Sequence, residues 1–157
     1  MKKSAIILFC LLVSTTSLLA NLKHEFRATW FTTHYGIDWP KTKATSDSKR
    51  EQQKQEMTAI FDKMKAGNMN VVCMQVRALC DATYKSSYEN WSSGLTGTRG
   101  KDPGYDPLAF AIEEAHKRGL ELHVWVNPFR VTSSGTISTS DKVWQNAGQW
   151  IIKYDNG

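Results

Sequence analysis

The sequence predicts an α/β fold built on a parallel sheet, and two observations support this. Residues 120–131 alternate apolar side chains with side chains that carry an imidazole, an indole and an amide. The apolar set is Leu122, Val124 and Val126, and the opposite set is His123, Trp125 and Asn127. Three such strand segments alternate with two helical segments, and each connection is long enough for a right-handed parallel crossover.

A strand with one apolar face and one chemically functional face is typical of a barrel. Its outer side packs on helices, and its inner side fills the lumen and reaches the active-site mouth at the carboxyl end. The sequence therefore predicts about three βα units forming the N-terminal part of a (β/α)8 barrel. The alternative is that His123 and Trp125 are satisfied core residues and that Arg130 is a solvated loop charge.

The first twenty residues have the layout of a secretory signal peptide. Lys2 and Lys3 precede an apolar run at residues 5–13, and the small residue Ala20 stands at the expected cleavage point. Leu18 is not the small residue preferred before the cut, so retention of the segment as a membrane anchor stays open. We expect residues 1–20 to be a signal peptide, residues 21–157 to be barrel domain, and the protein to be exported to the periplasm, cell envelope or medium.

The charge balance does not indicate a nucleic-acid partner, and the spacing of the histidines does not indicate a metal site. Removal of residues 1–20 takes two lysines and leaves 18 basic and 15 acidic residues, a balance too mild and scattered to indicate nucleic acid. The four histidines have no metal-ligand spacing to each other or to the cysteines. No metal and no cofactor are predicted. Cys73 and Cys80 are read as unpaired, because a strand between them would hold them too far apart for a disulfide.

The first βα unit is predicted from residues 25–66. Residues 25–33 are rich in aromatic and β-branched side chains and form the first strand. The loop at 34–40 carries Asp38 and Trp39. A helix at 49–66 follows, with one apolar stripe and Gly67 just past its end. The stripe is Met57, Ile60, Phe61 and Met64.

The second strand, residues 69–76, repeats the two-faced pattern. Val72, Met74 and Val76 form one face, and Val71, Cys73, Gln75 and Arg77 form the other. Two strands therefore carry polar side chains at the same end of the sheet. Asp81 follows the second of them in the sequence. The long segment 85–104 is predicted to be a binding loop, because structureless loops of this length in compact domains are usually functional or disordered.

The last predicted helix begins at Asp106 and Pro107 as cap and first residue, and Gly119 ends it before the third strand. Residues 141–148 give no clear signal. Residues 149–154 are predicted to form a short strand that runs into a turn at 155–157. Because a domain rarely stops at such a turn, we expect the chain to be truncated.

Several stretches resemble the glycosyl-hydrolase-like family 10 domain of bacterial envelope and secreted proteins. They are EFRATW (25–30), IDWP (37–40), QVR (75–77), DATYKS (81–86), PGYDPL (103–108) and HVWVNPFR (123–130). The sequence departs from the family pattern at Ala78 and at residues 32–35. The resemblance implies a (β/α)8 barrel that hydrolyses O-glycosyl bonds, with peptidoglycan glycan strands as one substrate class. Such a barrel takes about 250 residues, so the chain is expected to be its first portion and inactive alone.

The expected role of this portion is to form part of a sugar cleft. Glycoside hydrolysis generally needs two carboxylates, and the resemblance implies a carboxylate-rich motif beyond Gly157, so no catalytic residue is assigned. Asp38 or Asp81 could instead be catalytic. The candidate substrate-binding residues are Asp38, Trp39, Gln75, Arg77, Asp81, His123, Trp125, Asn127 and Arg130. A second hypothesis is a non-catalytic glycan-binding protein on the same barrel, because a fold does not establish chemistry.

Overall fold

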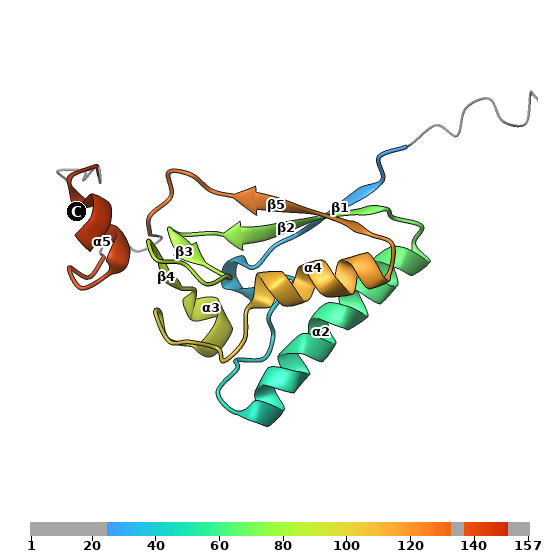
Figure 1. Cartoon of the computed structure of the whole chain (residues 1–157), viewed down its shortest axis with the longest axis horizontal. Coiled ribbons are helices and arrows are strands. Elements are labelled where there is room, and N and C mark those ends of the chain that lie inside the picture. Colours follow the sequence, from blue (N-terminus) through green and yellow to red (C-terminus); the bar gives the residue numbers. More distant parts are fainter. Residues whose placement is uncertain (1–24, 133–136, 151–157) are drawn as a thin grey trace, which may run out of the picture.

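The computed structural model describes residues 25–132 and 137–150. Three strands form one parallel sheet in the order β1-β2-β5, namely β1 (Ala28–Phe31), β2 (Val71–Arg77) and β5 (Glu121–Val126). The helices α2 (Asp47–Ala66) and α4 (Pro107–Lys117) connect successive strands and cover the same face of the sheet (Figure 1). The predicted α/β class, the parallel sheet and the order of the five elements are confirmed.

The ends of the helices follow from capping chemistry. Ser46 caps α2 by accepting a hydrogen bond of 3.3 Å from the backbone N–H of Lys49, so this helix begins two residues before the predicted start. Asp106 caps α4 as predicted, accepting from the N–H of Ala109 at 3.0 Å. Gly119 follows α4 with a φ of 64°, a backbone conformation that favours glycine.

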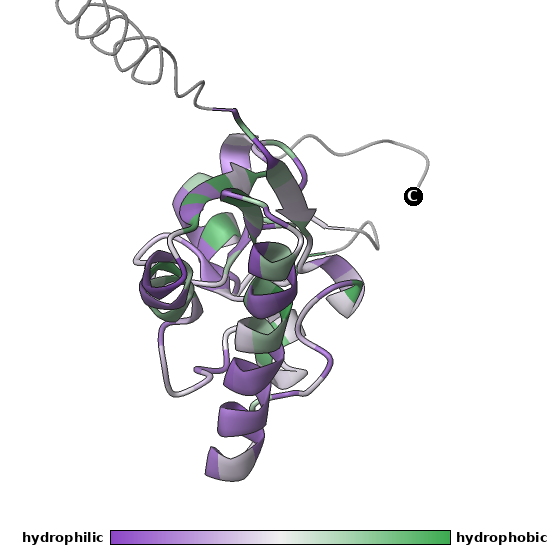
Figure 2. Cartoon of the chain, turned by 90° about the vertical axis from the view of Figure 1, so that its right-hand side faces the viewer, coloured by the Kyte–Doolittle hydropathy of each residue, from purple (hydrophilic) through white to green (hydrophobic). Residues whose placement is uncertain are grey.

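The core lies between the sheet and the two helices. Met57, Phe61 and Met64 of α2 and Ala111 and Ala115 of α4 contribute to it. The sheet contributes the predicted helix-facing side chains of β2 and one side chain of β1, which are Val72, Met74, Val76 and Phe31. The amino-terminal turns of α2 are hydrophilic (Figure 2). The two faces of β2 are therefore arranged as the alternation predicts.

The opposite face of the sheet carries aromatic side chains. Trp30 pairs in register with Cys73, which pairs with His123. The rings of Trp30 and Trp125 meet edge to face, with 5.0 Å between their centroids. These residues stand on the side that the alternation assigns to the inner surface of a barrel.

The outer face of β5 differs from the expectation. Val124 and Val126 are 55% and 46% exposed, although their face was predicted to pack on helices. Only Leu122 of this set packs against the core. The reason is that α4 covers the start of the strand, and no other helix in the described residues lies over Val124 and Val126.

The segment after β2 is folded rather than an extended loop. The short strands β3 (Asp81–Ala82) and β4 (Asn90–Trp91) pair in parallel, and the short helix α3 (Ser93–Thr96) follows. Leu95 in α3 is fully buried in the core. The predicted binding loop therefore contains packed secondary structure that lies beside the carboxyl end of the sheet (Figure 1).

The remaining described elements are three short helices. They are the 3-10 helix η1 (His34–Gly36), α5 (Lys142–Ala147) and the 3-10 helix η2 (Gly148–Trp150). The strand predicted at 149–154 is wrong for its first two residues, because Gln149 and Trp150 belong to η2. The remaining residues of that predicted strand, the predicted turn at 155–157 and the predicted signal peptide lie outside the described residues. Within the described ranges, no helix has the length and apolar character needed to cross a membrane.

Replacing Phe61 by alanine tests the core. In the full-length protein, Phe61→Ala should lower the free energy of unfolding by about 3–5 kcal/mol, because it opens a cavity at a fully buried position. Denaturant titration measures this. Ile112→Ala on α4 is the control, since its side chain is 38% exposed, and it should cost less than about 1 kcal/mol. Equal losses would contradict the assigned core.

Candidate functional site

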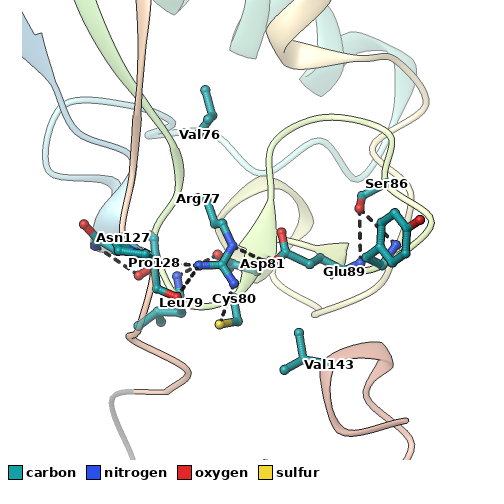
Figure 3. A network of polar contacts seen from close by, with 12 residues as sticks. Val76, Arg77, Leu79, Cys80, Asp81, Ser86, Glu89, Asn127, Pro128 and Val143 are labelled. Carbon is teal, nitrogen blue, oxygen red and sulfur yellow. Dashed lines mark hydrogen bonds and ion pairs between the residues drawn. The ribbon is translucent and has the colours of Figure 1, made fainter. Parts of the chain in front are cut away.

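The carboxyl ends of β1, β2 and β5 lie at one edge of the parallel sheet, and polar side chains gather there. Arg77 is the centre of this group (Figure 3). Its Nε donates to Glu89, its Nη1 donates to the carbonyls of Asn127 and, at 3.2 Å, Pro128, and its Nη2 lies 2.8 Å from the Cys80 sulfur. One guanidinium thus joins the ends of two strands to the segment that carries Glu89.

The pairing of Arg77 with Glu89 is largely shielded from water. The two side chains are 17% and 11% exposed. The register shifts between Gln75 and Arg77, so that Arg77 rather than Val76 stands opposite Val126 of β5. Val76 consequently stays in the core while the guanidinium reaches the carboxyl edge.

Gln75 organises the loop that follows β1. Its buried Oε1 accepts hydrogen bonds from the Thr32 hydroxyl at 2.7 Å and from the backbone N–H groups of Thr33 at 3.1 Å and His34 at 3.0 Å. Exposed Asp38 accepts from the N–H of Thr32 at 2.8 Å. The amide predicted to face a sugar therefore holds the backbone of a neighbouring loop.

A second cluster lies beyond the end of β2. Buried Asp81 accepts from the N–H of Leu79 at 3.0 Å, and its other oxygen lies 3.8 Å from Arg99. Arg99 also pairs with buried Asp141, and it donates to the carbonyls of Leu79 at 3.2 Å and Cys80 at 2.8 Å. These contacts fasten β3, the segment after α3 and the start of α5 together.

The side chains at the end of β5 contact one another and β2. Asn127 accepts from the Trp125 indole N–H at 2.9 Å and donates to the carbonyl of Ala78 at 3.1 Å. His123 is half exposed, lies 3.4 Å from Glu121 and packs near the ring of Phe26. Arg130 is exposed. Asn127 therefore connects the end of β5 to the end of β2, whereas the His123 ring is half exposed to solvent.

Trp39 is the one candidate that the structure places in the core. Its side chain is fully buried, packs near Phe31, and donates from its indole N–H to the carbonyl of Gln53 at 2.9 Å. The expectation that this indole binds a sugar face needs correction, because both of its faces are enclosed by the protein. The tryptophan instead anchors the loop after β1 to α2.

Burial and neighbouring charges perturb the pKa values of several groups. Burial, and then the charge of Arg130, lower the pKa of His34, while Asp81 partly opposes them, so the imidazole is neutral at pH 7. Burial and the nearby carboxylate of Glu89 raise the pKa of Tyr84. The hydrogen bond from the His34 N–H to Gln75 places the loop after β1 beside the end of β2.

Gln75, Arg77, Asp81 and Asn127 come together at the carboxyl edge as their positions in the strands predict. Substrate binding by them stays a prediction. The sequence reasoning missed Glu89, Arg99 and Asp141, because nothing in their local spacing marks them. Among residues 25–132 and 137–150, no group of three or more metal-ligating side chains could hold a metal ion.

Fold and site together define a parallel α/β protein with a polar site at the carboxyl ends of its strands. The chain belongs to the glycosyl hydrolase-like 10 family, whose sequence model matches residues 25–156. It is 42% identical over 149 residues to the glycosyl hydrolase YngK of Bacillus subtilis (strain 168), covering 92% of this chain and 29% of YngK. It is 38% identical over 118 residues to the glycosyl hydrolase DigH of Escherichia coli (strain K12), covering 71% of this chain and 27% of DigH. The chain thus spans less than a third of the length of these relatives.

The Arg77–Glu89 pair should contribute measurably to stability. In the full-length protein, Arg77→Ala should lower the free energy of unfolding by about 2 kcal/mol or more, because it leaves a shielded carboxylate and two carbonyls without their donor. A double-mutant cycle with Glu89→Gln should give a coupling above about 1 kcal/mol. The Glu51–Lys54 pair, in which the Glu51 side chain is 61% exposed, is the control and should give less than about 0.5 kcal/mol. Similar couplings for the two pairs would argue against this role.

Asp141 should make the stability depend on acid pH. Burial acts to raise the pKa of Asp141, but hydrogen bonds from Arg99 and the N–H of Val143 outweigh burial and lower it. A carboxyl whose folded pKa is depressed contributes stability above its unfolded value of about 3.9, and this contribution is lost as the pH falls through the folded value.

Asp141→Asn should therefore lower the melting temperature of the full-length protein at neutral pH, and it should lose less stability than the wild type between about pH 6 and about pH 3. Thermal melts across this range measure the difference. Asp47→Asn changes a carboxylate that is 94% exposed and should keep the wild-type slope. A wild-type slope in Asp141→Asn would rule out the proposed linkage.

Proposed function

We propose that the protein is a glycoside hydrolase that acts on a polysaccharide, and that this chain forms the first three βα units of its (β/α)8 barrel. Membership of the glycosyl hydrolase-like 10 family supports the chemistry. The architecture supports the barrel, because consecutive strands are neighbours and both long helices cover one face. In such a barrel the face that carries Trp30, His123 and Trp125 is the inner one.

The observation that carries the proposal is the gathering of polar side chains where the three parallel strands end. Active sites of parallel barrels are built at this edge, from residues that follow several different strands. Gln75 joins the loop after β1 to β2, and Arg77 joins β2 to β5. A site assembled from three successive strands is suited to a substrate that lies across them, such as a sugar chain.

The candidate residues then divide by what they already contact. Gln75, Arg77 and Asn127 use much of their hydrogen-bonding capacity within the protein, so we assign them the role of shaping the cleft. Asp38 and Arg130 are exposed and are suited to contact sugar hydroxyl or acetamido groups directly. Trp125 and His123 line the inner face below them. The catalytic carboxylates stay unassigned.

The proposed substrate class rests on the family resemblance, and the proposed location rests on the pattern of the first twenty residues. The glycan strands of peptidoglycan are the polysaccharide that we propose, because the family resemblance includes this substrate class. Residues 1–20 are proposed to be a signal peptide that directs the barrel domain to the periplasm, cell envelope or medium, with membrane attachment if the segment is retained. An exported glycoside hydrolase and an envelope polysaccharide would occupy the same compartment.

A glycan-binding protein without hydrolytic activity is the second candidate. The three shielded carboxylates of the site, Asp81, Glu89 and Asp141, all lie beside guanidinium groups. A general acid must present its carboxyl group to the glycosidic oxygen, whereas these carboxylates already contact arginine side chains of the protein. In the described residues, this arrangement favours binding over acid catalysis.

One assay separates the two candidates. The full-length protein is incubated with purified peptidoglycan, and both new reducing ends and the amount of protein that sediments with the insoluble glycan are measured. A hydrolase should release reducing ends, whereas a binding protein should sediment without releasing them. Insoluble cellulose is the control polymer, since it has the same backbone linkage but lacks acetamido groups. Neither release nor sedimentation with peptidoglycan would refute both functions.

A further inference from the structure

The loop after β1 holds a tyrosine in an unfavourable backbone conformation. Tyr35 has φ 53° and ψ 13°, in the left-handed region that residues with a side chain rarely adopt. Gly36 follows it with a φ of 63°. Such conformations persist only where the surroundings impose them, and they concentrate at functional sites.

Hydrogen bonds on both sides impose this conformation. Before Tyr35, the buried amide of Gln75 accepts from the N–H of His34 at 3.0 Å. After it, the Lys41 ammonium donates to the carbonyls of Gly36 at 2.9 Å and Ile37 at 2.7 Å. The turn is therefore fixed by the sheet on one side and by its own loop on the other.

The strain at Tyr35 is not offset by burial of its ring. The side chain is 76% exposed, and its ring lies beside that of His34, with 4.0 Å between the centroids. A glycine at this position would avoid the strained conformation, and a polar residue would leave less apolar surface in water. A rigid loop that presents an aromatic ring to solvent is a costly arrangement unless the ring has a ligand.

The ring stands at the carboxyl edge of the sheet. Its neighbour His34 donates its backbone N–H to Gln75, near the carboxyl end of β2, at 3.0 Å. Exposed Asp38 lies three residues further along the same loop. An aromatic surface is thus found in the same loop as an exposed carboxylate, which can accept hydrogen bonds from hydroxyl groups.

We propose that Tyr35 is a platform on which a sugar ring of the substrate stacks, a subsite that rests on the proposed glycan function. The C–H groups on one face of a pyranose ring can pack on the electron-rich face of a tyrosine. The polar edge of the same sugar then points toward side chains such as Asp38 and Arg130. The fixed loop keeps the ring in place before the sugar arrives, which reduces the entropy lost on binding.

The test compares three variants of the full-length protein. Tyr35→Ala removes the ring, Tyr35→Trp keeps an aromatic face, and Ile37→Ala is the matched control, since it removes a non-aromatic side chain that is 61% exposed in the same loop. Binding is measured by calorimetric titration with soluble N-acetylglucosamine oligomers and by sedimentation with purified peptidoglycan. Thermal melts report folding.

Tyr35→Ala should weaken glycan binding about tenfold, which corresponds to about 1.4 kcal/mol, with a melting temperature equal to or above that of the wild type. Tyr35→Trp and Ile37→Ala should bind within about twofold of the wild type. A lower melting temperature with unchanged affinity in Tyr35→Ala would show that the ring is structural and would overturn the platform alone. Equal losses in Ile37→Ala would also overturn it. If the wild type binds neither glycan, the proposed function itself fails.

Discussion

The guanidinium of Arg77 is the interaction on which the arrangement of the carboxyl edge depends. A parallel sheet fixes its strands along their length, but the segments that leave the strands have no ladder to hold them. Arg77 supplies that connection by binding Glu89 and the carbonyls that follow β5. Because a guanidinium carries five N–H donors in a rigid plane, it can hold several acceptors in one fixed geometry, whereas the three donors of an ammonium group rotate.

Polar side chains near the sheet edge act mainly on the backbone. Gln75 holds the loop after β1, Asn127 holds the end of β2, and Arg99 holds the turn at Leu79 and Cys80. In the described residues, no buried side-chain nitrogen or oxygen lacks a hydrogen-bond partner. The polar groups that mark this edge in the sequence are therefore also the groups that keep its loops in place, as expected where a site must be preorganised.

The fold was predictable where the pattern was periodic, and the site was predictable only in part. The alternation in β2 and the stripe on α2 report local geometry, so they located strand, helix and core face correctly. Local periodicity cannot show which distant residue meets Arg77, and Glu89 was missed for that reason. Trp39 was misplaced because a single aromatic residue in a polar loop gives no sign of whether the loop folds back on a helix.

The strand order has a consequence for how the chain can fold during synthesis. In the described part, β2 lies between the strand before it and the strand after it along the chain, so the sheet can grow from its amino-terminal end by adding one unit at a time. Each pairing joins residues more than forty positions apart, as in Ala28 with Val71 and Val71 with Glu121, so each addition must close a long loop and is slow. Val124 and Val126 lie on the strand at the growing edge. While this surface is uncovered during synthesis, it is a place where other chains or chaperones can associate with the nascent sheet.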